Sequence, residues 1–210
     1  MTEQLTAAGR LAASWLLWYP DDALTERLPQ IKAVVPELEP KIREPLSLFI
    51  EALENTDRLE LQRHYVAIFD MKLKASPYLS FWTDGDTRNR GFSILRFKQA
   101  YIAEGFEVDD AELPDHLSVV LEFAAVGNSL TGDALLVEHR VAIGLLRAAL
   151  EKFNSPYVHV VDAVLATLPA ITREISERMA SLAKQGPPTE MVGLDPFPTS
   201  LNLAELGGRR

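Results

Sequence analysis

Hydrophobic positions along this chain recur at three- and four-residue steps, the spacing of an amphipathic helix. The first run ends before Pro20 and consists of Leu5, Ala8, Ala12, Trp15, Leu16 and Tyr19. Further runs predict helices over residues 24–34, 41–54, 57–69, 86–104 and 114–127. Strict strand alternation and repeats of fixed period are missing from the sequence. The pattern predicts an all-α, single-domain bundle of roughly eight to nine helices.

Capping residues refine the helix boundaries. The candidate N-caps are short polar side chains just before or at the start of a helical run: Asp57, Asp86, Glu112, Asp115, and either Thr131 or Asp133. Glu60 stands three residues after Asp57, which is typical of a helix start. The helix that Thr131 or Asp133 begins is expected to continue unbroken to Phe153. Gly105 is a natural C-terminal stop.

The composition and the hydrophobic pattern of the chain change near its C-terminus. Residues 170–184 form a last amphipathic pattern, so we expect a helical domain over residues 1–184. Residues 185–210 are rich in proline and glycine and cannot continue a helix, yet they carry many apolar side chains. Two interpretations remain open for this tail. It is either disordered, or a strap that docks on the bundle or covers its binding groove.

Composition and charge narrow the classes of function. The chain has 210 residues, 47% of them hydrophobic, and no cysteine, which excludes disulfides and thiolate chemistry. No run approaches the roughly 18 apolar residues of a membrane span, and the start Met1-Thr2-Glu3-Gln4 lacks the basic residues of a secretory signal. We therefore expect a cytoplasmic protein without membrane insertion. A net charge of −9 argues against nucleic acid; it suits a basic partner, although acidity also keeps chains soluble.

The sequence lacks the motifs of an enzyme. There is no glycine-rich phosphate loop, nucleophile elbow or dinucleotide fingerprint. The four histidines (His64, His116, His139 and His159) do not have metal-ligand spacing. Asp115, His116 and Ser118 stand too close together on one helical turn for a catalytic triad. We expect a protein that is not an enzyme and that carries no metal or cofactor.

Aromatic, proline and charged residues concentrate at the helix junctions between residues 65 and 122. Pro77 biases the preceding residue toward an extended conformation, so the chain should cross between helices there. Trp82 and Phe81 are expected in the core, as are Trp15 and Trp18, whereas Tyr78 suits a core edge and a binding groove equally.

Two arginines in this stretch require a partner. Arg88 and Arg90 fall in the first turn of a predicted helix, where cations oppose the helix dipole. A carboxylate such as Asp84, Asp86 or one on a neighbouring helix should compensate. We expect structural salt bridging first and contact with a partner second.

Five segments of this stretch carry a family resemblance. They are Tyr-Val-Ala-Ile-Phe-Asp at 65–70, Ser-Pro-Tyr-Leu at 76–79, Gly-Asp-Thr-Arg-Asn-Arg-Gly at 85–91, Phe-Lys-Gln-Ala-Tyr at 97–101 and Glu-Leu-Pro-Asp-His-Leu at 112–117. Together they resemble the NarJ family of nitrate reductase assembly chaperones, within the TorD-like group of redox-enzyme maturation chaperones. The segment at 85–91 favours NarJ over its relatives, while Pro-Asp-His is shared more widely.

The resemblance implies a cytoplasmic chaperone that binds the N-terminal leader of the apo catalytic subunit of a molybdenum oxidoreductase. Respiratory nitrate reductase is the favoured client. The chaperone would hold the leader until the iron–sulfur and molybdenum cofactors are inserted. We expect a monomer or weak dimer. The peptide-binding residues that the resemblance implies are Tyr65, Phe69, Tyr78, Asp86, Arg88, Glu112, Asp115, His116 and Glu122. The alternatives are an adaptor for another client, a chaperone for another molybdenum oxidoreductase, and an enzyme or nucleotide-binding regulator without a known motif.

Overall fold

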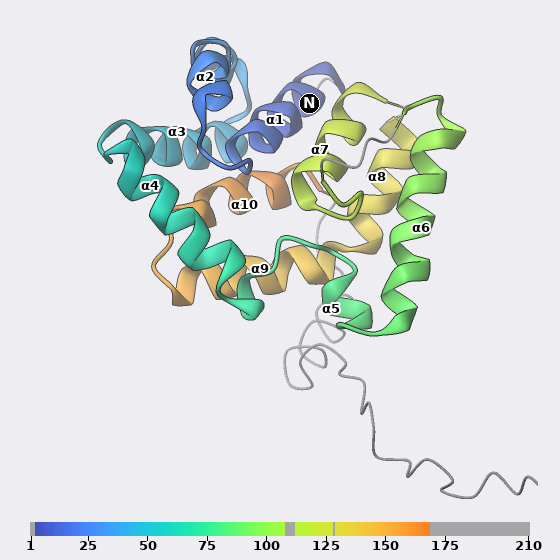
Figure 1. Ribbon diagram of the computed structural model, residues 1–210. Helices are drawn as coiled ribbons and strands as arrows, with labels where there is room; N and C mark the ends of the chain where they lie inside the picture. Colours follow the sequence, from blue (N-terminus) through green and yellow to red (C-terminus); the bar gives the residue numbers. More distant parts are fainter. Residues whose placement is uncertain (1–2, 108–111, 128, 169–210) are drawn as a thin grey trace, which may run out of the picture.

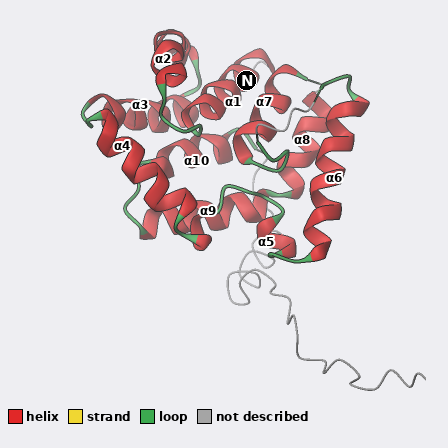
Figure 2. Cartoon of the chain, viewed as in Figure 1, coloured by secondary structure: helices red, strands yellow, loops and turns green. Residues whose placement is uncertain are grey.

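The computed structural model describes residues 3–107, 112–127 and 129–168 (Figure 1). Within these ranges the chain forms ten α-helices: α1 Glu3–Leu16, α2 Asp22–Val34, α3 Pro40–Glu54, α4 Arg58–Tyr65, α5 Phe81–Asp84, α6 Arg88–Ala103, α7 Leu117–Val126, α8 Ser129–Glu138, α9 Arg140–Lys152 and α10 Tyr157–Ala166. Three shorter helical turns are Val35–Glu37, a π-helical turn at Val66–Asp70, and Leu73–Ala75. No strand occurs in these ranges (Figure 2), so the all-α prediction is confirmed. The predicted last helix and the tail lie outside the described residues.

The core lies where α1, α7 and α10 meet. In Figure 1, α2, α3 and α4 lie on one side of these helices and α6 and α8 on the other, with α9 crossing below. Helix α1 packs against both α7 and α10, and α10 also packs against α3 and α9. Leu16, Leu121 and Tyr157 are fully buried there. Burying a leucine side chain contributes about 1.5–3 kcal/mol. The Ser14 hydroxyl donates to the Ser118 carbonyl at 2.8 Å and fixes α1 against α7.

Several predicted boundaries are confirmed and others are wrong. The Asp57 carboxylate accepts a hydrogen bond from the Leu59 N–H at 2.9 Å, so it caps α4 as expected. Asp86 does not cap α6. The chain turns at Gly85, which has φ +64°, and the extended residue Thr87 then precedes the helix. This turn leaves Asp86 exposed at the surface.

Two other predicted helix N-termini are also wrong. His116, rather than Glu112 or Asp115, caps α7 by accepting from the Ser118 N–H. The long helix expected to reach Phe153 is two helices, and neither Thr131 nor Asp133 is its N-cap. The break lies at His139, whose backbone (φ −96°, ψ 13°) leaves the helical region. Its ring Nδ1 lies 3.0 Å from the Leu135 carbonyl, a local contact that the hydrophobic pattern does not reveal.

Candidate functional site

Two segments from the 65–122 stretch pair with each other to build the site. The Leu79 N–H donates to the Asp115 carbonyl at 2.9 Å, and the Leu117 N–H donates to the Pro77 carbonyl at 3.0 Å. These bonds form an isolated antiparallel bridge between Tyr78 and His116. The extended conformation that Pro77 imposes makes this pairing possible. It places the Ser-Pro-Tyr-Leu and Pro-Asp-His elements side by side.

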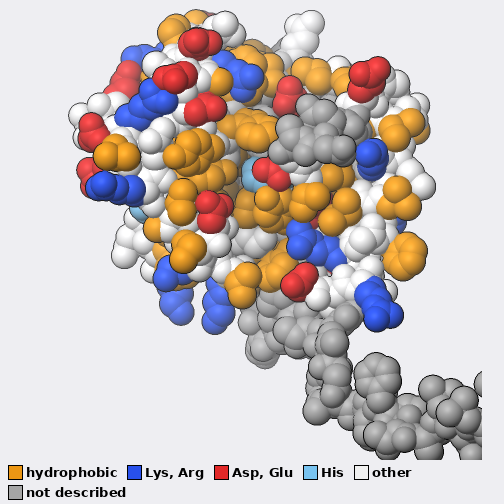
Figure 3. Space-filling model, viewed as in Figure 1, with side chains coloured by type: hydrophobic (Ala, Val, Ile, Leu, Met, Phe, Trp, Pro, Cys, Tyr) orange, Lys and Arg blue, Asp and Glu red, His pale blue; other side chains and the backbone are white. Residues whose placement is uncertain are grey.

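A groove of about 680 Å³ opens beside this bridge. Its lining residues come from the π-helical turn, the chain leading to α5, the start of α6 and the loop before α7: Phe69, Asp70, Leu73, Lys74, Ser76, Tyr78, Phe81, Asp86, Arg90 and Leu113. Two of its apolar side chains are well exposed, Leu73 by 76% and Leu113 by 41%. Hydrophobic side chains gather across the centre of this face between α4 and α6, where the surface is hollowed (Figure 3).

Aromatic side chains support the groove from behind. The Phe69 ring lies 4.7 Å from the Tyr65 ring and 5.0 Å from the Tyr157 ring, measured between centroids. Tyr65 is buried and donates its hydroxyl to the Leu17 carbonyl at 3.2 Å. These contacts hold the Phe69 ring in place in the groove wall.

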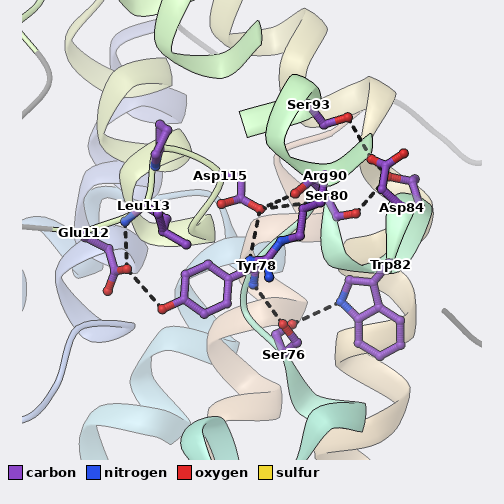
Figure 4. A network of polar contacts seen from close by, with 12 residues as sticks. Ser76, Tyr78, Ser80, Trp82, Asp84, Arg90, Ser93, Glu112, Leu113 and Asp115 are labelled. Atoms are coloured by element: carbon purple, nitrogen blue, oxygen red, sulfur yellow. Dashed lines mark hydrogen bonds and ion pairs between the residues drawn. The ribbon is translucent and has the colours of Figure 1, made fainter. Parts of the chain in front are cut away.

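Tyr78 forms the opposite side of the groove and is hydrogen-bonded to Glu112. The Tyr78 hydroxyl donates to Glu112 Oε1 at 3.0 Å, and the same oxygen accepts from the Leu113 N–H at 2.8 Å (Figure 4). Burial of the phenol, followed by the nearby Glu112 charge, raises the pKa of Tyr78 above its ordinary value. The phenol is therefore neutral and serves as a fixed hydrogen-bond donor that orients Glu112.

Asp115 lies beneath the groove and is fully buried. Its Oδ2 accepts from the Ser80 hydroxyl at 2.5 Å and from the Ser80 N–H at 3.3 Å, and Arg90 Nη2 lies 3.9 Å away (Figure 4). Burial raises the pKa of Asp115, while the bonds from Ser80 and the Arg90 charge oppose that shift. The predicted salt bridge between Arg90 and a neighbouring carboxylate is thus found at Asp115.

His116 is a structural residue in this arrangement. Its ring lies 5.9 Å from Trp18, stacked, and 5.2 Å from Tyr78, edge to face. Its Nδ1 accepts a hydrogen bond from the Ser118 N–H at 3.2 Å, so this nitrogen is unprotonated. Burial lowers the pKa of His116 to about 4. Since the Asp115 carboxylate is bonded to Ser80 instead, these three neighbours do not form a triad.

The sequence-predicted residues fall into three groups. Phe69, Tyr78 and Asp86 line the groove. Behind or beside it lie four more: Tyr65, Glu112, Asp115 and His116. Arg88, at the start of α6, and Glu122, on α7, are exposed and lie outside its lining.

Sequence reasoning missed part of the lining. Leu73 and Leu113 were not singled out, although a leucine beside a charged junction is a signal that could have found them. Trp82 is buried as expected, with its indole N–H donating to the Ser76 carbonyl at 3.0 Å. Phe81 is only half-buried because it faces the groove, and Trp15 and Trp18 sit half-buried at the edge of the core.

Neither a metal centre nor a membrane helix is found in the described part of the chain. Its histidines, aspartates and glutamates do not gather in threes around a common point as metal ligands would. Among the helices of residues 3–168 that the structure describes, none combines the length and apolar character needed to cross a bilayer.

Comparison with known proteins identifies relatives of this chain. Residues 35–162 match the family model of the nitrate reductase delta subunit. The chain is 34% identical over 158 residues to the probable nitrate reductase molybdenum cofactor assembly chaperone NarJ of Bacillus subtilis, covering 75% of this chain and 86% of that protein. It is 27% identical over 180 residues to the nitrate reductase molybdenum cofactor assembly chaperone NarJ of Escherichia coli, covering 83% and 76%. Relatives with these names are chaperones and not catalytic enzymes.

Two further similarities complete the comparison. The nitrate reductase-like protein NarX of Mycobacterium tuberculosis is 37% identical over 155 residues, covering 74% of this chain, which spans only 23% of that longer protein. The crystal structure of a putative redox enzyme maturation protein from Archaeoglobus fulgidus shares the fold, with a TM-score of 0.56 and 24% identity over 76% of this chain and 91% of that one. The family model and the Bacillus relative each cover most of the bundle, so the resemblance to the NarJ family is confirmed and the chain belongs to the nitrate reductase delta subunit family.

Proposed function

We propose that this protein is a cytoplasmic assembly chaperone for a molybdenum oxidoreductase, with respiratory nitrate reductase as the favoured client. It binds the N-terminal leader of the apo catalytic subunit and holds it until the iron–sulfur and molybdenum cofactors are inserted. Family membership supports the maturation role. The single observation that supports leader binding is the exposed apolar groove beside the Tyr78–His116 bridge.

The groove has the size and chemistry to take one face of a helical peptide. Its volume of about 680 Å³ accommodates several apolar side chains but not a folded domain. An amphipathic helix placed in a groove presents apolar anchors at three- and four-residue spacing. Phe69 and Tyr78 supply aromatic walls for such anchors, and Leu73 and Leu113 supply contact surface that is otherwise exposed to water.

Exposed acidic side chains at the groove suit a basic leader. Asp70 and Asp86 are both exposed and both line the groove, where the cations Lys74 and Arg90 also lie. Carboxylates at an interface rim raise the rate of association with a cationic partner more than they raise its affinity. The net charge of −9 acts in the same direction over longer distances. Release after maturation requires modest affinity, which a small groove with an exposed rim provides.

Titration with a leader peptide tests this function. The probe is a synthetic peptide of the first residues of the nitrate reductase catalytic subunit from the same genome, about 20 residues and therefore roughly 30 Å as a helix. The variant Leu73→Ser with Leu113→Ser removes apolar contact from the groove without opening the core. We expect its dissociation constant, measured by calorimetry, to rise roughly 10-fold or more.

The matched control is Leu48→Ser with Phe92→Ser, which removes two exposed apolar side chains (50% and 71%) from α3 and α6, outside the groove. We expect wild-type affinity from this control. Equal affinities for both double variants would contradict the assignment of the groove. A pull-down identifies the client independently, because an adaptor for another system would retain a protein other than a molybdenum oxidoreductase subunit.

A further inference from the structure

The guanidinium of Arg90 is held rigidly in the wall of the groove. Its side chain is 18% exposed. Its Cζ lies 5.3 Å from the centroid of the Tyr78 ring and 6.0 Å from that of the Phe81 ring, distances typical of cation–π contacts. The Asp115 carboxylate forms an ion pair with it (Figure 4). The position of the guanidinium is therefore set before any ligand arrives.

The hydrogen-bonding capacity of Arg90 is not used by these contacts. Its Nη2 lies 3.9 Å from Asp115 Oδ2, which is an ion pair but too long for a hydrogen bond. Its Nε and Asp115 Oδ1 are both buried atoms, and among the described residues neither has a hydrogen-bond partner. The N–H groups of a guanidinium point outward in its plane. Because Nε is buried, the terminal nitrogens are the donors of this partly exposed side chain that a ligand in the groove can reach.

Unsatisfied donors in a folded site call for an explanation. Buried polar groups are almost always hydrogen-bonded, and leaving one unpaired destabilises the folded state. A residue whose only role was to brace Asp115 would gain stability by closing the distance to form a direct hydrogen bond. Arg90 instead remains beside the Tyr78 and Phe81 rings in the groove lining. Its terminal nitrogens, rather than the buried Nε, are placed to donate to a ligand.

We propose that Arg90 determines the specificity of the groove by donating hydrogen bonds to an oxygen acceptor of the bound leader. This inference rests on the proposed function. Two oxygens of a leader have the required chemistry. A carboxylate side chain matches the planar fork of arginine. The carbonyls at the C-terminal end of a leader helix lack partners within the helix and carry the negative end of its dipole. Either would select for the position and direction of the helix in the groove.

The test compares Arg90→Met with Arg96→Met in titrations with the leader peptide. Arg96 is an exposed residue of the same helix, ion-paired with Glu138 and outside the groove, so it controls for loss of one charge from α6. We expect Arg90→Met to weaken binding roughly 10- to 100-fold, since a hydrogen bond to a charged group is lost. Arg96→Met should leave affinity within about 2-fold of wild type. Arg90→Lys keeps the charge without the fork and should fall between them.

A double variant separates two roles of Arg90: contact with the leader and stabilisation of the buried Asp115. Arg90→Met leaves the buried Asp115 without its cation, which destabilises the fold by itself. Adding Asp115→Asn removes that unpaired charge while keeping an acceptor for Ser80. We expect the double variant to melt at a higher temperature than Arg90→Met and still to bind the leader weakly. Recovery of wild-type affinity in the double variant would overturn the inference, because Arg90 would then act only through Asp115.

Peptide variants identify which oxygen Arg90 binds. In one peptide every Asp and Glu is replaced by Asn or Gln. If Arg90→Met still weakens binding of this peptide, the acceptor is a main-chain carbonyl; if the effect disappears, it is a carboxylate. Failure of the two proposals can be told apart. No binding of any leader peptide to the wild-type protein contradicts the proposed function, whereas wild-type binding that Arg90→Met leaves unchanged contradicts only the role of Arg90.

Discussion

Packing of the His116 ring between Trp18 and Tyr78 favours the neutral imidazole, because neither aromatic neighbour solvates a proton. The nearby Glu112 charge opposes this effect but is the weaker influence, and the pKa of His116 falls to about 4. The neutral Nδ1 accepts the N-cap hydrogen bond of α7. Protonation would remove that acceptor and bury a charge. The protonation state of His116 therefore affects both the N-cap of α7 and the ring contacts with Trp18 and Tyr78 at the site.

Acidification should therefore destabilise the fold through His116. An unfolded histidine has a pKa of about 6.5, so its neutral form contributes fully above that pH, and this contribution is lost as pH falls through about 4. We predict that the wild-type protein loses roughly 2 kcal/mol more unfolding free energy between pH 7 and pH 5 than His116→Asn. Asparagine keeps an N-cap acceptor and does not titrate.

Urea denaturation at both pH values measures this difference. His64 and His139, whose pKa values burial also lowers, are present in both proteins and cancel in the comparison. Equal losses in the two proteins would show that His116 is not neutralised by its surroundings.

Helices α7 and α8 approach each other closely at one glycine. A Cβ atom built on Gly132 would lie 2.5 Å from the Cα of Ala124 and 2.6 Å from its Cβ. The nearest atom belongs to the backbone, so relief requires the two helices to move apart. This contact fixes α7, and α7 in turn carries His116 at its N-terminus.

A pair of glycine-to-alanine variants tests this packing. Gly132→Ala should reduce the unfolding free energy by about 1–3 kcal/mol through overpacking. Gly91→Ala is the matched control, because a Cβ at this position of α6 meets no atom within 4 Å. The control should be stabilised by roughly 0.5–1 kcal/mol, since alanine favours the helix over glycine. Thermal unfolding followed by circular dichroism gives both values, and destabilisation of equal size in the two variants would rule out the steric account.

The sequence predicts those elements that depend on local signals. Asp57 caps its helix and Gly105 ends another with φ +83°, because both effects act within one turn. The break at His139 was not predictable, since apolar residues continue through it on both sides. The π-helical turn after Tyr65 was likewise read as ordinary helix. The hydrophobic pattern reveals neither the local contact between His139 and the Leu135 carbonyl nor the π-helical turn.

Prediction of the site has the same physical limit. Tyr78 could be chosen because an aromatic residue after Pro77 suits a groove, whereas Phe69 was implied by the family resemblance; both line the groove. The burial of Asp115 follows from the pairing of two segments distant in sequence, which no local pattern encodes. The same pairing decides that Arg90 lies in the groove wall. The types of residue at the site were thus predictable, whereas the burial of Asp115 and the position of Arg90 were not.

The charge of the whole molecule and that of the groove act over different distances. A net charge of −9 attracts any cationic chain, whereas Asp70 and Asp86 lie at the groove itself. Salt at physiological ionic strength screens charges beyond about 8 Å, so the groove carboxylates should dominate the capture of a basic leader. They are also exposed, and removing their charges should leave the core unaffected.

We therefore predict that Asp70→Asn with Asp86→Asn slows leader association roughly 3- to 10-fold at low salt, as measured by stopped-flow fluorescence. The control, Glu44→Gln with Glu51→Gln, makes the same change in net charge on exposed positions of α3, away from the groove, and should slow association far less. At about 1 M salt, where the screening length is near 3 Å, all three proteins should associate at similar rates. Equal slowing by both double variants would instead assign the attraction to net charge, and the groove carboxylates would have no special part in capturing the leader.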